Sequence, residues 1–242
     1  MGQELLRFVH ASLLDPVHET PADHAEKPVR RRVVCLVALL VGAWLLHASL
    51  SVRPGDPLFY PATGALGLWW LVSGRLSGPV VAGHARTRSG VGTSFGIGQS
   101  LVWGLSLLVL FLAGAVVVSR IPVLSTPVQQ LLDHARRGSL PLVAVLTAFN
   151  GLGEEYFFRG ALFQALPKRH RVLFSTLVYG VVTVVSGVPL LVLAALMLGA
   201  LTALQRRATG GYLAPMVTHL TWSLGMLFLL PSALALGQRM LS

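Results

Sequence analysis

The sequence predicts an all-α fold, a polytopic membrane helix bundle, from its composition and from the spacing of its apolar runs. Of the 242 residues, 54% are hydrophobic and only 12% are charged, and the mean hydropathy is +0.70. This combination is atypical of a soluble domain. A helix needs about 20 apolar residues to cross a hydrocarbon core roughly 30 Å thick. The length of the chain therefore accommodates about seven transmembrane helices.

Each predicted span is a long apolar run bounded by charged, Gly or Pro residues. The runs lie at residues 33–52, 58–72, 93–119, 140–166, 172–187, 190–205 and 212–236. Between the third and the fourth, "TPVQQLLDHARRG" places Val128, Leu131 and Leu132 on one face of a helix and polar side chains on the other. That pattern predicts a short interfacial helix.

The segment before the first span differs in composition from the rest. Residues 1–32 are polar and end in "KPVRRR". The first apolar run begins too late and is too long for the apolar core of a signal peptide. We therefore expect a cytoplasmic N-terminal tail at 1–32, followed by one transmembrane domain at 33–242.

The positive charges predict the orientation of the chain. With the N-terminus inside, 13 of the 19 Lys and Arg residues are cytoplasmic, five are outside, and Arg159 lies within a span. This bias favours a cytoplasmic N-terminus and an external C-terminus. Because these charges occupy short loops and form no single basic face, we expect the lipid bilayer, and no nucleic acid, as the partner. The excess of Arg over Lys suggests a GC-rich genome and a prokaryotic cell membrane.

Three charges lie within the fourth predicted span, in "FNGLGEEYFFRGALFQAL" at residues 149–166. An ionised carboxylate near the centre of a span costs roughly 2.5–3.5 kcal/mol, so Glu154 and Glu155 require a protein-lined or hydrated cavity. Glu155 precedes Arg159 by four residues, and the two can pair along one helix face. Glu154 then points elsewhere. It is either a protonated acid in a purely structural brace or a general base that acts on water.

A histidine in the last span is the second candidate group. His219 and Ser223 are four residues apart in "APMVTHLTWSLGM" and share one helix face. By helix rise, His219 lies about 12 Å and Glu154 about 18 Å from the cytoplasmic ends of their helices. We expect both to line one cavity that opens toward the cytoplasm. A hydrogen bond across helices is the alternative for a lone histidine.

These residues resemble the motifs of the CPBP family, the CAAX proteases and bacteriocin-processing enzymes also called Abi, which are intramembrane endopeptidases. "EEYFFR" matches the family's EExxxR motif, and "RRATGGYLAPMVTHLTWS" is similar to its last motif, a His followed four residues later by Asn. The similarity covers about residues 140–237. The sequence departs from the family at two polar positions. The family's middle motif is Phe-x-x-x-His, and here Tyr179 stands at its aromatic position and Thr183 where its His should be. In the last motif, Ser223 stands where the family has Asn.

The resemblance implies roles for these residues. Glu154 is the base that activates water, Glu155 and Arg159 form the supporting pair, and His219 donates to the oxyanion. Thr183 and Ser223, in place of the family's His and Asn, together with Tyr179 at the aromatic position, are candidate substituted positions of the site. We expect no required cofactor. Zinc is the less favoured alternative, because two adjacent Glu do not point at one ion and the second His is absent.

Two functions remain open at this stage. The first is an endopeptidase that cleaves a membrane protein or a lipidated peptide with water activated by Glu154. The second is a weakened or inactive protease fold that binds a partner membrane protein or a lipid. A transporter is less favoured, because the predicted spans show no repeat and the charges cluster on one helix.

Overall fold

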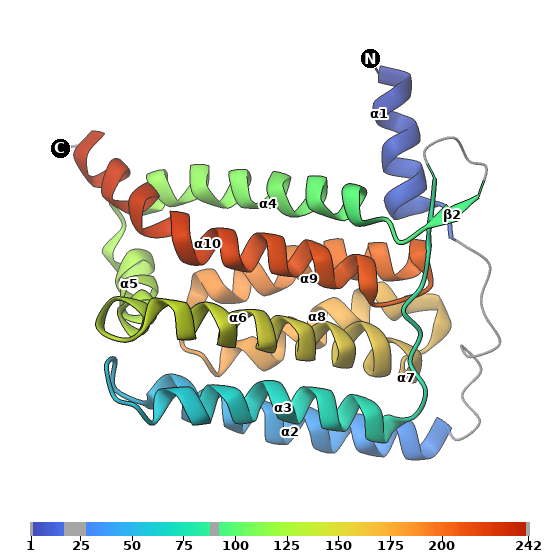
Figure 1. The fold of residues 1–242 in the computed structure, drawn as a ribbon, viewed down its shortest axis with the longest axis horizontal. Helices are drawn as coiled ribbons and strands as arrows, with labels where there is room; N and C mark the ends of the chain where they lie inside the picture. Colours follow the sequence, from blue (N-terminus) through green and yellow to red (C-terminus); the bar gives the residue numbers. More distant parts are fainter. Residues whose placement is uncertain (1, 17–27, 88–91, 241–242) are drawn as a thin grey trace.

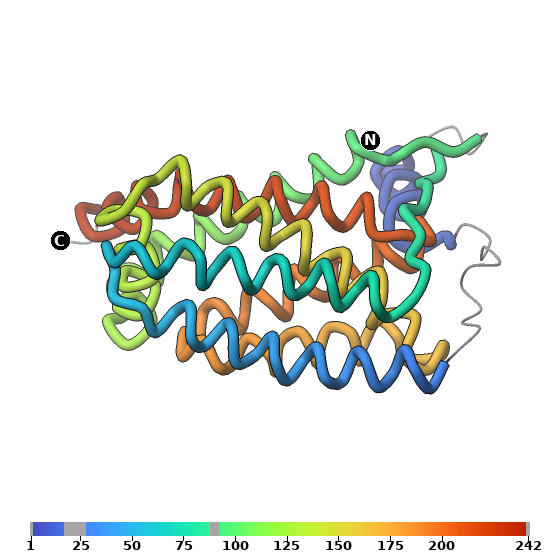
Figure 2. The backbone as a smooth tube through the Cα atoms, turned by 60° about the horizontal axis from the view of Figure 1, so that its bottom comes forward, coloured from blue at the N-terminus to red at the C-terminus, as the bar shows by residue number. Residues whose placement is uncertain are grey.

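The computed structural model describes residues 2–16, 28–87 and 92–240. Long helices lie roughly parallel to one another and form a bundle (Figures 1 and 2). The helical elements are α1 Gly2–Val9, η1 His10–Leu14, α2 Pro28–Ser51, α3 Phe59–Ser77, α4 Ile97–Val118, α5 Pro122–Arg137, α6 Leu140–Glu155, η3 Tyr156–Leu162, α7 Phe163–Ala165, η4 Lys168–His170, α8 Arg171–Val184, α9 Pro189–Thr209 and α10 Leu213–Met240.

The predicted all-α class is confirmed. Four of the described helices, α2, α4, α9 and α10, are long and apolar enough to cross a membrane. The other three predicted spans are also helical, in α3, in the continuous stretch α6–η3–α7, and in α8. However, α8 has only 14 residues, which gives about 21 Å at 1.5 Å per residue, shorter than a hydrocarbon core. The count of seven spans therefore stays a prediction.

The start of the third predicted span is wrong. Thr93–Ser94 (β2) pairs antiparallel with Ala85–Arg86 (β1), and helix α4 begins only at Ile97. The reason is local: Gly96 has φ +66°, a left-handed conformation that separates the strand from the helix. The helix between the third and fourth runs is present as α5, and Val128 and Leu132 on its apolar face are buried.

The described part of the expected N-terminal tail is helical. Its first part forms α1 and a π-helical turn, η1, and helix α2 begins at Pro28, earlier than expected. Ser12 and Leu13 are buried. Trp103 of α4 donates its indole N–H to the Ser12 hydroxyl at 2.9 Å, and Arg207 of α9 donates to the Leu13 carbonyl at 3.4 Å. The N-terminal segment thus packs against the end of the bundle that Figure 1 shows beside α7.

Helices α3 and α6 approach closely because both carry glycine at the contact. A Cβ atom on Gly153 would lie 2.6 Å from the Gly67 carbonyl oxygen and 3.2 Å from the Cβ of Trp70. Small residues at such a contact allow close backbone approach, which is how membrane helices gain packing energy. The contact fixes the part of α6 that leads into Glu154.

We predict that Gly153→Ala destabilises the fold. In an open helix position, Gly→Ala is stabilising by about 1 kcal/mol, but here the new methyl overlaps a backbone carbonyl, and overpacking of this kind costs about 1–3 kcal/mol. The matched control is Gly114→Ala in α4, where an added Cβ meets nothing within 4 Å. Thermal unfolding of the purified chain in detergent measures both. Equal Tm values for the two variants would contradict the close contact.

Candidate active site

A cavity of about 250 Å³ lies among α2, α3, α5, α6, α8, α9 and α10. Its walls contain five of the seven residues singled out in the sequence: Glu154, Tyr179, Thr183, His219 and Ser223. The other two, Glu155 and Arg159, are completely buried directly behind it. Folding therefore gathers at one place groups that lie far apart in the chain.

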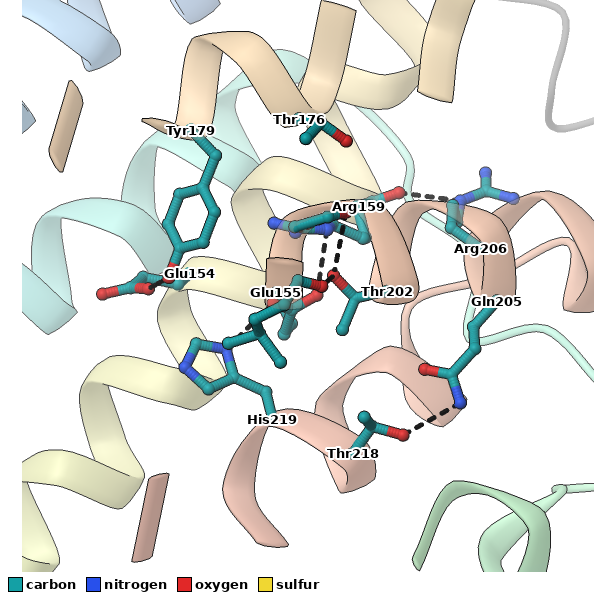
Figure 3. A network of polar contacts seen from close by, with 12 residues as sticks. Glu154, Glu155, Arg159, Thr176, Tyr179, Thr202, Gln205, Arg206, Thr218 and His219 are labelled. Atoms are coloured by element: carbon teal, nitrogen blue, oxygen red, sulfur yellow. Dashed lines mark hydrogen bonds and ion pairs between the residues drawn. The ribbon is translucent and has the colours of Figure 1, made fainter. Parts of the chain in front are cut away.

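Glu154 is held by the hydroxyl of Tyr179. The phenolic O–H donates to Oε2 of Glu154 at 2.5 Å, a short distance typical of a hydrogen bond to a carboxylate. The two residues come from different helices, α6 and α8, and Figure 3 shows the tyrosine reaching down to the carboxylate. Glu154 thus has one protein donor and lines the cavity.

Glu155 makes the brace predicted for it. Its Oε2 lies 3.3 Å from Nε of Arg159, and both side chains are fully buried. Its Oε1 lies 2.9 Å from Nδ1 of His219 on α10. Because a carboxylate only accepts, the hydrogen must sit on Nδ1. Glu155 therefore fixes the ring of His219 and leaves Nε2 as the nitrogen that is available to a ligand.

Arg159 has partners that the sequence did not indicate. The Tyr179 ring lies under its guanidinium, with the centroid 4.9 Å from Cζ, and its Nη2 donates to the Gly199 carbonyl at 3.3 Å. The main-chain carbonyl of Arg159 accepts from Nε of Arg206 at 2.7 Å (Figure 3). These contacts join α8 and α9 to η3. A π-helical turn such as η3 often occurs at functional sites.

The two substituted positions bond to their own helices. Thr183 donates its hydroxyl to the Tyr179 carbonyl at 2.8 Å, and Ser223 donates to the Leu220 carbonyl at 3.5 Å. Both still line the cavity. Each hydroxyl keeps lone pairs that can accept from a water in the cavity.

The cavity wall extends toward one end of the bundle, and the opening toward the cytoplasm expected for it stays a prediction. Besides the polar groups, its walls include Ser49 and Leu50 in the last turn of α2, Phe59 at the start of α3, and Leu131 of α5. All four belong to the end of the bundle that carries α5, opposite to the end that carries α7 (Figure 1). Glu154 and His219 do line the same cavity. Phe158, one turn after Glu154, also forms part of the wall, and its ring packs against that of Phe157; both rings are completely buried.

A second, apolar cavity of about 480 Å³ adjoins the first toward the same end. Seven residues line both cavities, among them Trp222 and Ser223. The remaining walls come mainly from apolar side chains of α4, α5, α9 and α10. The polar groups therefore lie beside a space that suits a hydrocarbon chain.

Asn150 is a site residue that we did not predict. It lines the cavity one helical turn before Glu154, and its amide donates to the carbonyls of Thr63 and Leu146 at 3.0 and 2.9 Å. Its Oδ1 is buried and has no partner among the described residues. The sequence did contain a signal for it, because Asn150 and Glu154 are four residues apart and so share a helix face.

The donor set does not suit a metal ion. Within the described residues, no three His, Cys, Asp or Glu side chains lie close enough to form a ligand group. The candidate donors are Glu154, Glu155 and His219, and the carboxylate of Glu155 is already engaged by Arg159 and His219. What the site does offer is a carboxylate, an imidazole with one nitrogen available, and hydroxyl groups around a cavity, which suits acid–base chemistry on a bound water.

One comparison with known proteins gives a match. Residues 136–225 match the family model described as type II CAAX prenyl endopeptidase Rce1-like. The matched range starts at the end of α5 and includes all seven residues singled out in the sequence, although part of the cavity wall, such as Ser49 and Leu131, lies outside it. Comparisons with curated proteins and with solved structures give no match. The resemblance to the CPBP family is thereby confirmed for residues 136–225, where the chain is similar to the Rce1-like model.

Proposed function

We propose that the protein is an intramembrane endopeptidase that hydrolyses a peptide bond of a membrane-associated substrate. The observation that carries this proposal is the placement of Glu154 and His219 on the walls of one cavity. Each is oriented by a buried partner, Tyr179 for Glu154 and Glu155 for His219. Orientation by a partner is the arrangement expected of a working base and its assisting group.

The proposed chemistry is attack by water on the peptide carbonyl carbon. Glu154 takes a proton from the water as the oxygen bonds to carbon, and the carbonyl becomes an oxyanion. With Nδ1–H directed at Glu155, His219 donates to that oxyanion through Nε2 when both ring nitrogens carry hydrogen. The C–N bond then breaks, and the leaving amine takes its proton from Glu154. No step uses a metal.

The apolar cavity supports a lipid-linked or transmembrane substrate. It shares Trp222 and Ser223 with the polar cavity, so a hydrocarbon chain seated there would hold a nearby peptide bond beside Glu154. Burial of about 480 Å³ of apolar space favours such a chain over a free polar peptide. We place the protein in a prokaryotic cell membrane, with the N-terminus inside, on the distribution of Arg and Lys.

A second function is favoured by one observation. Thr183 and Ser223 direct their hydroxyl hydrogens to their own helices, so neither supports Glu154 or an oxyanion in the way that the His and Asn of the family would. A protease fold of this kind can serve as a binding protein for a membrane partner or a lipid. Copurification of a stoichiometric partner that does not depend on the Glu154 carboxylate would favour this function over catalysis.

We expect Glu154→Gln to abolish cleavage while leaving the fold intact. Removal of a general base typically costs about 10²–10⁴ in rate, and Gln keeps the size and can still accept from Tyr179. The measurement compares the N- and C-termini of membrane proteins in cells that express wild type or variant. Glu4→Gln, at an exposed glutamate, is the control. Identical termini in wild-type and Glu154→Gln cells would refute the endopeptidase.

Tyr179→Phe tests the hydroxyl that orients Glu154. A hydrogen bond to a charged group contributes about 1.5–3 kcal/mol, so the loss predicts a decrease in kcat of roughly 10- to 100-fold with little change in KM. Tyr212→Phe removes a hydroxyl that is not part of the cavity wall and should behave as wild type. If Tyr179→Phe also retains full kcat, the hydroxyl has no part in catalysis.

Thr183→His restores the residue type of the family's middle motif. Because an imidazole can carry a proton and a threonine cannot, we expect processing to increase by at least about tenfold, within the usual contribution of general acid–base catalysis. Thr183→Asn controls for the larger side chain. Equal or lower processing by a folded Thr183→His variant would show that position 183 does not correspond to that histidine.

A further inference from the structure

The end of the bundle beside α7 carries a strongly basic cavity that the proposed reaction does not use. Its volume is about 710 Å³. None of the described lining residues is acidic, and six carry a basic side chain. The six basic residues are Lys168, Arg169, His170, Arg171, Arg206 and Arg207.

Two elements bring these cations together. The η4 turn and the first residue of α8 supply four of them, and the last turn of α9 supplies two. The two elements meet at Phe163, whose ring lies 5.9 Å from the Cζ of Arg171 and 5.3 Å from the Cζ of Arg206. The aromatic ring thus holds two guanidinium groups on one side of the cavity.

One wall of the cavity is rigid. Arg206 is only 3% exposed, and its Nε donates to the main-chain carbonyl of Arg159 at 2.7 Å. Arg171 is tied in the same manner, by its Nε to the Leu166 carbonyl at 3.2 Å. Planar guanidinium groups that are fixed in advance lose little entropy when they bind an anion, and they match the oxygen geometry of a phosphate.

The remaining walls are mostly apolar, which suits an amphiphilic ligand. Val172 and Leu173 in the first turn of α8 and Ala200 of α9 form most of this part, and Leu173 is 53% exposed. Pro16, Gly210 and Thr176 complete the lining, and the Thr176 hydroxyl donates to the Val172 carbonyl of its own helix. α9 is one of the helices apolar enough to cross a membrane, and the cavity lies where it ends. The cavity therefore has an apolar wall next to a group of cationic side chains, which is the arrangement of a binding site for a lipid headgroup.

We propose that this cavity binds the phosphate headgroup of an anionic phospholipid, with the start of an acyl chain along Val172, Leu173 and Ala200. This proposal is independent of the proposed endopeptidase activity. It commits to a lipid because a free phosphate would make no use of the apolar wall. A bound headgroup would lie one hydrogen bond away from Arg159, through Arg206.

The test measures lipid binding by the full-length protein in detergent. Phosphatidylglycerol, phosphatidylcholine and inorganic phosphate are added separately, and the readouts are retained lipid by native mass spectrometry and the shift in Tm. We expect phosphatidylglycerol to bind and stabilise, and the other two to do neither. Equal binding of phosphatidylcholine would overturn the requirement for negative charge. Full competition by inorganic phosphate at the concentration of the lipid would overturn the lipid assignment.

Paired variants distinguish this site from general attraction to a basic surface. Arg169→Gln with Arg207→Gln removes two exposed cations of the cavity and should weaken phosphatidylglycerol binding by roughly 30-fold, about fivefold for each. Arg30→Gln with Arg75→Gln removes two cations from the same end outside the cavity and should change binding little. Equal losses in the two pairs would refute the site. Arg169→Lys with Arg207→Lys keeps the charge and serves as a folding-competent check, with intermediate binding expected.

Discussion

Glu155 and Arg159 are both fully buried, and their pairing is the constraint on which the rest of the site depends. Isolated, either charge would cost several kcal/mol, whereas a paired and hydrogen-bonded couple can be tolerated. Glu155 meets Arg159 through one oxygen and His219 through the other. Arg159 in turn bonds to α9 through Gly199. The need to satisfy two charges thus draws α9 and α10 onto the same part of α6–η3.

The same constraint orients the groups that face the cavity. His219 can direct Nε2 at a ligand because Glu155 holds Nδ1. Tyr179 packs its ring against Arg159 and directs its hydroxyl at Glu154, so one side chain serves both the brace and the candidate base. A site assembled in this way has little freedom to relax, which suits the preorganisation that catalysis requires.

The hydroxyl of Tyr179 provides a polar contact to Glu154 in a chain that departs from the family motif. At this position the family motif has phenylalanine, and the histidine four residues later is replaced here by Thr183, which bonds to its own helix. A polar contact to Glu154 is present nonetheless, and it comes from the residue one turn earlier on α8. Tyr179 can orient a carboxylate, but as a neutral phenol it is a poorer proton carrier than an imidazole. Whether the protein is a slow protease or a binding protein therefore depends on how well proton transfer proceeds at Glu154 without that imidazole.

Much of the architecture was determined by local sequence. The apolar runs located the helices, and the spacing of Glu155 and Arg159 predicted their ion pair, because both features depend on helical period and on the cost of burying charge. The start of α4 was missed, because a single left-handed glycine at position 96 overrode the apolar run. The packed N-terminal turn was also missed, because the contact of Ser12 with Trp103 joins segments whose proximity no local pattern encodes.

Only the tertiary structure decided which groups face one another and where the cavities open. The hydrogen bond from Tyr179 to Glu154 and the contact of Arg206 with Arg159 cross between helices, and helical period carries no information on which helices become neighbours. The cavity wall reaches Leu131 of α5 and includes the completely buried ring of Phe158, and neither contact follows from a local pattern. The sequence by itself determined that Glu154 stands apart from the ion pair, whereas packing determined what surrounds it.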